Sequence, residues 1–488
     1  MDKIILDKMD AVAAVMESNG EGQPDGRRGS SPRNGEEGGG RRLDYGAIAE
    51  AFTATLDAPL RWHRGQWWAY ARRRGAYELT TEAEVGSCVA AFLSGATSPA
   101  PYSKNAERSV VGALRANYVP QSMKMPCFLG AGTPAVGWVA MENGMLDVEA
   151  AALGDPAPMR PHTPDFFSPY CFPYPWDPSA ECPRFMRFLE DVQPDQDGRE
   201  MLQMMTGLLL VPDTSYNVFF ILYGEGGCGK STFLRIVGAM LGDGNVCSVP
   251  LSMISEKHTT HRLTQHLANL VDDSPTSDGK QSFLSVEGVL KLITSGGKLH
   301  VEPKGQDPWE APATARCVFC QNPPLPQFAD RSNGLWDRLR IVPFPRRFRG
   351  TAEQNPRLAD EIIAAELPGI FAWAVRGLGM LRALNEFPRC EAGATMADEH
   401  RETCDREGAF LRERYKIANG EFTPSVDIYT SYRNWCDVGG YHPKNAANFA
   451  QEVRRVFGGA VKNVRKRLDG GNPVSGFLNL GGIGLCDD

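Results

Sequence analysis

The protein has 488 residues, of which 42% are hydrophobic and 23% are charged, a composition typical of globular proteins. This composition excludes a fully disordered chain and a fibrous repeat, and the length predicts roughly two to four domains. No stretch approaches the about 18 consecutive apolar residues of a membrane span. The amino-terminal sequence MDKIILDKMD carries acidic residues among its apolar positions, unlike a signal peptide, so we expect a protein that stays inside the cell.

The formal net charge of −7 argues against a surface that is basic throughout, but it permits a local basic groove. The 12 cysteines are scattered, and inside a cell they are expected to be reduced thiols. Cys317 and Cys320 have CxxC spacing, but no second pair completes a zinc site. The run around them is apolar, so a buried strand is the favoured interpretation.

The amino-terminal third divides into two parts. Residues 1–43 predict a short amphipathic helix over 3–18 and a disordered linker, rich in Gly, Ser and charge, over 19–42. Residues 44–183 predict a mixed α/β domain. Within it, RWHRGQWWAYARRRGAYEL alternates aromatic and basic residues, as a twisted β-hairpin does. Arg72, Arg73 and Arg74 could join its aromatic rings in binding nucleic acid. A half-buried hairpin is favoured, since aromatics are common in strands.

The rest of the chain predicts four further parts. Two helices form a lead-in over 184–216, and a second α/β unit covers 217–350. In that unit, apolar runs alternate with helices, which predicts a parallel sheet. The expected strands are 217–223, 268–271, 315–319 and 339–344. A helical segment over 351–400 precedes a small mixed domain over 401–488. The helices expected in this last domain lie near 406–418, 426–438 and 446–457.

A glycine-rich motif follows the first of these strands. The sequence GEGGCGKS at 224–231 matches GxxxxGK[ST] in full, and it lies between a buried strand and a helix. Glycines let backbone N–H groups turn toward phosphates, Lys230 can reach the β and γ phosphates, and the Ser231 hydroxyl can ligate Mg²⁺. The motif therefore predicts ATP and Mg²⁺ as ligands. The residues expected to bind the nucleotide are Gly224, Glu225, Gly226, Gly227, Cys228, Gly229, Lys230, Ser231 and Thr232.

Polar residues end two further strands of this unit. Asp272 and Asp273 follow the apolar run LANLV about forty residues after the glycine-rich motif. Asp272 is expected to hold Mg²⁺, and Asp273 to polarise the attacking water. Asn322 follows the strand CVFCQ and can sense the γ-phosphate or orient the water; it could equally begin a turn.

Two arginines precede the last strand, in GLWDRLRIVPF. Arg338 or Arg340 could be supplied to the γ-phosphate of a neighbouring subunit, where it would stabilise transition-state charge. By itself, each could equally be a solvated arginine at a strand edge.

These motifs, in this order, resemble superfamily 3 helicases, and most closely the phage and plasmid primase–helicase family that includes the poxvirus helicase–primase. The matching segments are GEGGCGKST, LVDDSP, FCQNPPLP and LWDRLRIVPF, and RFLEDVQPDQDGREMLQMMTGLLL resembles the family's helical lead-in. The resemblance covers residues 140–488. It implies a P-loop core of the AAA+ type in a hexameric ring that threads single-stranded DNA, with Asn322 as sensor 1 and Arg338 as the trans-acting arginine finger. It also implies a bacterial cytoplasm or an infected cell.

The resemblance also suggests where DNA would bind. In the family, the segment between the acids and Asn322 contacts DNA; here Lys298–Glu302 and Ala311–Cys317 can pair as a hairpin with Lys304 at its tip. A lysine there would meet phosphates without reading bases, and Lys298 and His300 are the next candidates. The final domain resembles a winged helix. Its basic cluster contains Arg454, Arg455, Lys462, Arg465, Lys466 and Arg467. This cluster predicts a DNA surface on a protein of negative net charge, although both regions could be solvated faces.

Many members of that family carry a primase in front of the helicase. Of the residues that precede the lead-in here, only about 140, residues 44–183, are expected to be ordered, and they contain no convincing DxD pair of metal-binding acids, so a separate primase or polymerase is an expected partner. The sequence predicts an ATP-dependent DNA helicase that acts in the replication of a phage, plasmid or integrated element. The alternative is an ATP-switched origin-binding scaffold that assembles on DNA without unwinding it. A small-molecule P-loop kinase would need neither a winged helix nor Arg338.

Overall fold

A computed structural model describes residues 43–96, 98–272, 284–302, 308–328, 333–467 and 472–483. The expected amino-terminal helix and linker lie outside these residues, and so do Asp273 and Lys304. Among the residues described, no helix is both long enough and apolar enough to traverse a lipid bilayer.

The first described part combines helices with a three-stranded antiparallel meander, β1–β2–β3. β1 and β2 are joined by the two residues Arg64 and Gly65, both with positive φ, the geometry of a tight type I′ hairpin turn. Helix α3 begins where Thr81 and Glu84 form a reciprocal capping box. The bounds are α2 Tyr45–Thr55, β1 Leu60–His63, β2 Gln66–Ala71, β3 Ala76–Thr80, α3 Glu82–Ser94 and α4 Lys104–Leu114.

The rings of the meander are buried, which decides between the two interpretations of this segment. Trp67 and Trp68 are 1% and 2% exposed, and Tyr70 is also buried, so these rings are core residues and offer no stacking surface. Arg72 donates to the backbone oxygen of Asp57, and Arg74 pairs with Glu78 at 2.6 Å. The half-buried hairpin is therefore confirmed, and the aromatic nucleic-acid site is wrong.

Short strands and a helix pair connect this part to the central sheet. β6 and β7 pair in antiparallel fashion across the turn at Glu142 and Asn143. Both lead-in helices are present as α6 and α7. The bounds are β4 Cys127–Phe128, β5 Thr133–Pro134, β6 Trp138–Met141, β7 Gly144–Asp147, α5 Val148–Ala152, β8 Met159–Arg160, β9 Phe166–Phe167, α6 Pro183–Val192 and α7 Gln196–Leu208.

A five-stranded sheet follows, in the order β11–β12–β15–β10–β16, with every neighbouring pair parallel. β10 lies between β15 and β16, and its residues 219–222 are buried on both faces. The strands are β10 Phe219–Tyr223, β11 Val246–Cys247, β12 Ala268–Val271, β15 Arg316–Gln321 and β16 Leu339–Pro343. The helices are α8 Lys230–Leu241, η1 Asp243–Asn245, η2 Leu251–Met253, α9 Thr260–Leu263, α10 Leu284–Thr294 and α11 Asn333–Trp336.

Each face of this sheet has its own hydrophobic core. Cys320 belongs to one core and Cys317 to the other, because residues three apart in a strand face opposite sides. The two thiols therefore cannot share a zinc ion, and both are buried packing residues.

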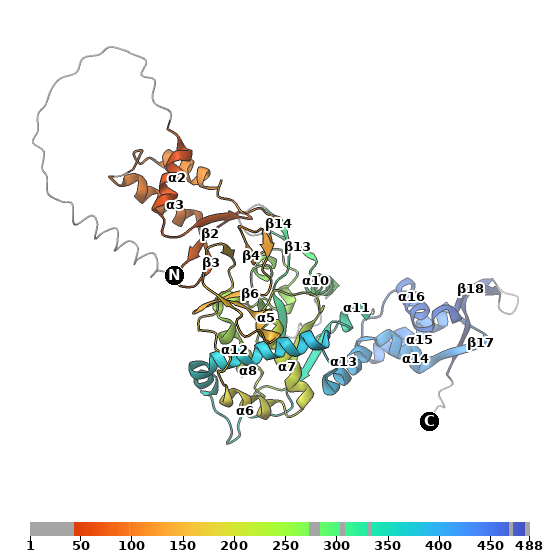
Figure 1. Ribbon diagram of the computed structural model, residues 1–488. Coiled ribbons are helices and arrows are strands. Elements are labelled where there is room, and N and C mark those ends of the chain that lie inside the picture. Colours follow the sequence, from red (N-terminus) through yellow and green to blue (C-terminus); the bar gives the residue numbers. More distant parts are fainter. Residues whose placement is uncertain are drawn as a thin grey trace, which may run out of the picture. The chain divides into compact units, whose positions relative to one another are not determined.

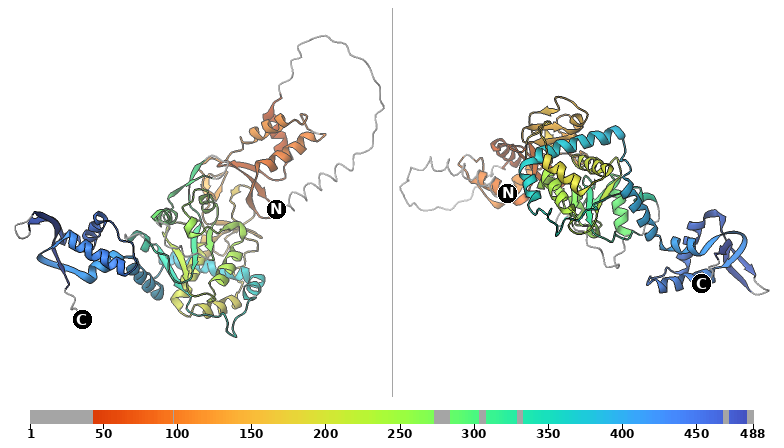
Figure 2. Two further views of the ribbon diagram at one scale, coloured as in Figure 1. Left: turned by 180° about the vertical axis from the view of Figure 1, so that it is seen from behind. Right: turned by 90° about the horizontal axis from the view of Figure 1, so that it is seen from below.

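The long helix α12 (Leu358–Leu384) covers one of these faces. It packs against α7 and α8, and Figures 1 and 2 show it, in cyan, lying across them. A Cβ atom on Gly207 of α7 would lie 2.3 Å from the backbone nitrogen of Leu378, and one on Gly377 would lie 2.2 Å from the oxygen of Gln203. Glycine at both positions lets the two helix backbones touch. α13 (Glu391–Cys404) then packs on β16.

The predicted DNA hairpin is present with a different second arm. β13 (Lys298–Val301) pairs with β14 (Trp309–Pro312), not with 311–317. The apolar residues of β15 are instead recruited into the parallel sheet, where burial on both faces stabilises them.

The residues after α13 form a group with its own core, blue in Figures 1 and 2. Its element order is helix, strand, two helices and two strands, and its sheet order is β17–β19–β18. The helix predicted over 406–418 ends at Arg414, because Tyr415 onward pairs with β19. The bounds are α14 Arg406–Arg414, β17 Tyr415–Pro424, α15 Ser425–Val438, α16 Ala446–Phe457, η3 Gly458–Ala460, β18 Lys462–Arg467 and β19 Pro473–Gly482.

Candidate functional site

The glycine-rich loop joins β10 to α8. The chain packs so closely around this loop that several of its positions have no room for a Cβ atom. Gly227 and Gly229 have φ of +87° and +97°, values that other L-residues rarely adopt. A Cβ on Gly229 would lie 2.6 Å from Cγ1 of Val192, at the end of α6, and one on Gly224 would lie 2.5 Å from the oxygen of Phe344. The lead-in helix and the segment after β16 thus hold the loop in shape from two sides.

Lys230, the first residue of α8, lies under this loop and is only 6% exposed. Its Nζ donates to the backbone oxygens of Gly224 at 2.6 Å and Glu225 at 2.9 Å. It also donates to Oδ1 of Asn322 at 3.0 Å. The ammonium group is therefore held between the loop and the residue that follows β15, and no carboxylate of the described residues is bonded to it.

These residues are of the types that would hold a nucleoside triphosphate and its Mg²⁺. The unpaired N–H groups at the start of α8 and the Lys230 ammonium favour anionic oxygens. Ser231 is exposed in the first turn, where its hydroxyl can ligate a cation. No trio of His, Cys, Asp or Glu gathers as a metal site in the described part of the chain, and Asp273 lies outside it.

The two predicted strand-end residues meet at the same edge of the sheet. Asp272 follows β12 and is exposed, while Asn322 follows β15. β12 pairs with β15 and β15 with β10, all in parallel, so their carboxyl ends and the glycine-rich loop share one edge. The structure therefore places Asp272 and Asn322 at the sheet edge where the loop lies, and a hydrogen bond joins Asn322 to Lys230.

Arg338 and Arg340 lie elsewhere. Arg338 precedes β16, and its backbone oxygen accepts from the N–H of Phe219, the first residue of β10. It is thus at the amino edge of the sheet, roughly 15 Å of strand from the loop of its own subunit. Its guanidinium donates to the Gly334 oxygen, and its Nε is buried without a hydrogen-bond partner. Arg340 donates to the oxygens of Asp337 and Leu339, and burial lowers the pKa of its guanidinium.

Arg349 is a candidate that sequence reasoning missed. Its N–H and that of Phe348 donate to the Gly227 oxygen, at 3.3 and 2.9 Å. A Cβ on Gly227 would lie 2.4 Å from Cβ of Arg349, so this arginine rests on the loop. The basic run Arg346-Arg347-Phe348-Arg349, directly after a strand that neighbours β10, is the signal that could have indicated it.

Two exposed surfaces carry the basic residues predicted to contact DNA. On β13, Lys298 and His300 are exposed on one face, while Leu299 and Val301 face the core. Lys298 lies 3.8 Å from a carboxylate oxygen of Glu310, and His300 lies 3.9 Å from one of Glu302. On β18, Arg465, Lys466 and Arg467 are exposed. Arg455 differs from this group because it pairs with Glu452 at 2.6 Å and Asp405 at 2.5 Å, so its charge is already compensated.

Comparisons with known proteins agree with the family that the order of the motifs suggests. Residues 135–194 match a family model described as D5 N terminal like, and residues 222–339 match a family of unknown function, DUF5906. A protein of Acanthamoeba polyphaga mimivirus, named as a helicase, is 25% identical over 244 residues, which are 48% of this chain and 24% of that protein. The chain thus matches about a quarter of that relative's length.

Solved structures share the fold. The apo structure of the NrS-1 C-terminal region matches with a TM-score of 0.53 and 10% identity, covering 90% of this chain and 100% of that one. A second form of the same region gives a TM-score of 0.51 with 11% identity. Together, these matches confirm the resemblance to the phage-type primase–helicase family of superfamily 3.

Proposed function

We propose that this relative of the superfamily 3 primase–helicases is an ATP-dependent DNA helicase that acts as a hexameric ring in the replication of a mobile element. The observation that carries the proposal is the hydrogen bond between Lys230 and Asn322 under the glycine-rich loop, with Asp272 at the same edge of the sheet. The strand order β11–β12–β15–β10–β16 supports a P-loop core of the AAA+ type.

In this proposal, the loop amides, Lys230 and the start of α8 hold the phosphates, and Ser231 and Asp272 hold Mg²⁺. Bound Mg²⁺ would neutralise charge on the phosphate oxygens. Asp273 accepts the proton of the attacking water, and Asn322 orients that water. Arg349 rests on the loop and is proposed to contact phosphate from within the same subunit. The hydrogen bond between Lys230 and Asn322 positions the lysine and the sensor relative to each other.

The DNA contacts are proposed on the two exposed basic surfaces. Lys298 and His300 lie on one face of the β13–β14 hairpin, with Lys304 between its strands in sequence. The order of elements from α14 to β19 supports a winged helix, with β18 and β19 as the wing. Phosphate contacts of this kind position DNA without reading its sequence.

The test of the proposed function is ATP hydrolysis measured with and without single-stranded DNA, beside strand displacement from a forked duplex. A motor should be stimulated by the DNA and should separate the strands. Stimulated hydrolysis without any displacement would favour the scaffold alternative, and no hydrolysis at all would contradict both functions.

We expect the β18 surface to supply part of the salt dependence of duplex binding. Replacing Arg465, Lys466 and Arg467 by Gln should lower the slope of log K against log salt by about 0.9 for each phosphate that the protein no longer neutralises. ATP hydrolysis without DNA should not change. Arg108→Gln with Arg187→Gln, two exposed arginines on α4 and α6, is the matched control. An unchanged slope in the triple variant would exclude the DNA role of β18.

A further inference from the structure

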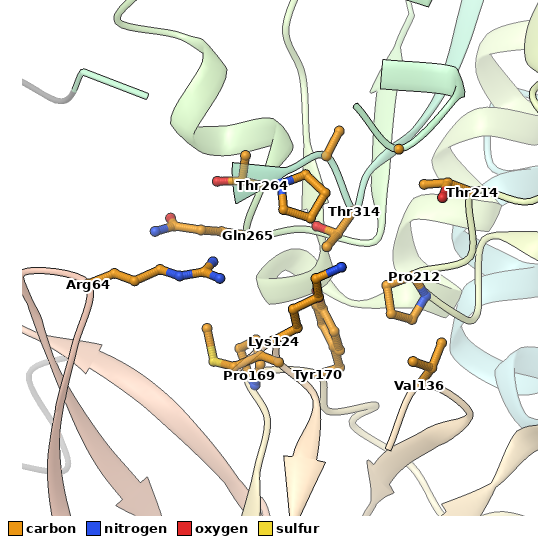
Figure 3. A pocket seen from close by; sticks show the side chains of 14 residues that line it. Arg64, Lys124, Val136, Pro169, Tyr170, Pro212, Thr214, Thr264, Gln265 and Thr314 are labelled. Atoms are coloured by element: carbon orange, nitrogen blue, oxygen red, sulfur yellow. The ribbon is translucent and has the colours of Figure 1, made fainter. Parts of the chain in front are cut away.

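A cavity of about 180 Å³ lies outside the residues that the proposed function uses. Its walls include Arg64 and Lys124 from the first described part, and Thr264, Gln265 and Thr314 from the central one. Figure 3 shows the Arg64 guanidinium and the Lys124 ammonium pointing into the space that these residues surround. The volume exceeds that of one water molecule, about 30 Å³ in the liquid, and falls below the about 300 Å³ of a typical drug-sized site.

The cavity lies at the sheet edge opposite the glycine-rich loop. Gln265 precedes β12, Thr314 precedes β15 and Thr214 precedes β10, so the walls come from residues in front of parallel strands. Gly296 and Pro312, which flank the β13–β14 hairpin, also line it. An occupant would therefore touch the base of that hairpin and would be separate from a nucleotide on the loop.

The lining is cationic. Arg64 and Lys124 contribute two positive charges, and no carboxylate is among the described residues that line the cavity. Burial lowers the pKa of the Arg64 guanidinium, whose Nη2 donates to the Gln121 oxygen at 3.5 Å. Tyr170 is 1% exposed, burial raises its pKa to about 12, and its neutral hydroxyl is hydrogen-bonded to Thr314 in the cavity wall.

A third cation lies against the wall. Arg316 is 1% exposed, and its Nε is buried without a hydrogen-bond partner. Among the described residues, its Nη2 donates to the oxygens of Ala313 and Thr314, at 3.4 and 3.3 Å, and both residues line the cavity. Burial lowers the pKa of Arg316 to about 10, and the attraction of the Asp213 carboxylate offsets only part of this effect. An anion in the cavity would further stabilise the charged guanidinium.

Arg64 is also held in an unfavourable backbone conformation. Its φ is +50°, in the first central position of a type I′ turn, where Asn or Gly is the usual residue. Gln265 on the opposite wall donates to Gln66 at 2.8 Å, and so fixes this hairpin to the central part. Arg64 occupies a strained turn position, and its side chain points into a cationic cavity. We infer from this combination that the side chain has a role in the cavity.

We propose that this cavity binds a phosphate group, supplied either by the backbone of a nucleic acid at the hairpin base or by a small phosphorylated molecule. A guanidinium and an ammonium group that converge on one space match the oxygens of a phosphate. Binding of free phosphate is independent of the proposed helicase function, whereas the nucleic-acid source rests on it.

The test uses the full chain and two variants, Arg64→Asn and Lys124→Gln, with Arg108→Gln as the control on an exposed helix face. Calorimetric titration with inorganic phosphate should show binding at least about tenfold weaker in both variants than in the control. Phosphate binding at the glycine-rich loop should be the same in all three proteins, so it does not affect the comparison between them. Arg64→Asn creates Asn-Gly, the preferred type I′ pair, so its Tm should equal or exceed that of the unmodified protein.

Titration with oligothymidylate at several salt concentrations identifies the source. If the phosphate comes from nucleic acid, both variants should also lower the salt slope by about 0.7 per phosphate. If they weaken inorganic phosphate binding and leave the DNA slope unchanged, the site takes a small phosphorylated molecule. Phosphate affinity equal to the control in both variants would overturn the proposal. If Arg64→Asn lowers Tm, Lys124→Gln alone decides by the same criterion.

Discussion

Lys230→Ala should reduce ATP hydrolysis by about 10²-fold to 10³-fold or more, the scale of losing one preorganised electrostatic group. Lys230 supplies the fixed positive charge under the loop, and its ammonium is positioned by Gly224, Glu225 and Asn322. No other lysine contacts the loop in the described part of the chain. Steady-state hydrolysis and nucleotide affinity, both measured on the same preparation, check this expectation.

Truncation of a side chain that is 6% exposed can also loosen the loop, so a second variant is needed. Lys230→Met keeps most of the volume and removes the charge, and it should lose as much activity as Lys230→Ala. Asp273→Asn is the matched contrast: it should retain nucleotide affinity and lose turnover, because only the activation of water is affected. Normal hydrolysis by Lys230→Met would exclude the proposed phosphate contact.

The central unit was largely predictable because its signals are local. A strand buried on both faces is a continuous apolar run, and the glycine-rich loop must follow such a strand to place its amides. The parallel arrangement then brings the ends of β12 and β15 to the same edge, so Asp272 and Asn322 could be assigned to the site from sequence position alone.

Other features depend on partners that are distant in the sequence. The second arm of the hairpin lies earlier in the sequence than predicted, because residues 316–321 pair with β10 and β12 instead. Tyr415 joins a strand because Gly482, far along the chain, pairs with it. Arg349 and Arg64 gave no periodic signal, since their positions depend on the loop and the cavity that surround them.

Arg338 cannot serve the glycine-rich loop of its own subunit. It lies beside the first residue of β10, at the amino edge, while the loop begins after the last residue of that strand. A role in hydrolysis therefore requires a second subunit, as the resemblance to hexameric helicases implies. Within the described part of the chain, its guanidinium donates to the Gly334 oxygen and its Nε has no hydrogen-bond partner.

Arg338→Ala should bind ATP about as well as the unmodified protein and hydrolyse it about 10³-fold more slowly, the scale of an arginine finger. Mixing it with Lys230→Ala should restore activity. In mixed rings, some interfaces combine an intact loop from the first variant with an intact arginine from the second. Because recovery requires contact between subunits, it should disappear on dilution below the concentration at which the rings assemble.

Arg340→Ala is the matched control, since Arg340 lies two residues away, is partly buried and hydrogen-bonds only to local backbone oxygens among the described residues. If Arg338 is the finger, Arg340→Ala should hydrolyse ATP at nearly the normal rate. Native mass must show that the two inactive variants assemble together. No recovery from folded, co-assembled Arg338→Ala and Lys230→Ala would exclude Arg338. Recovery of an inactive Arg340→Ala by Lys230→Ala would then assign the finger to Arg340, because only a residue that acts across the interface can be complemented in this way.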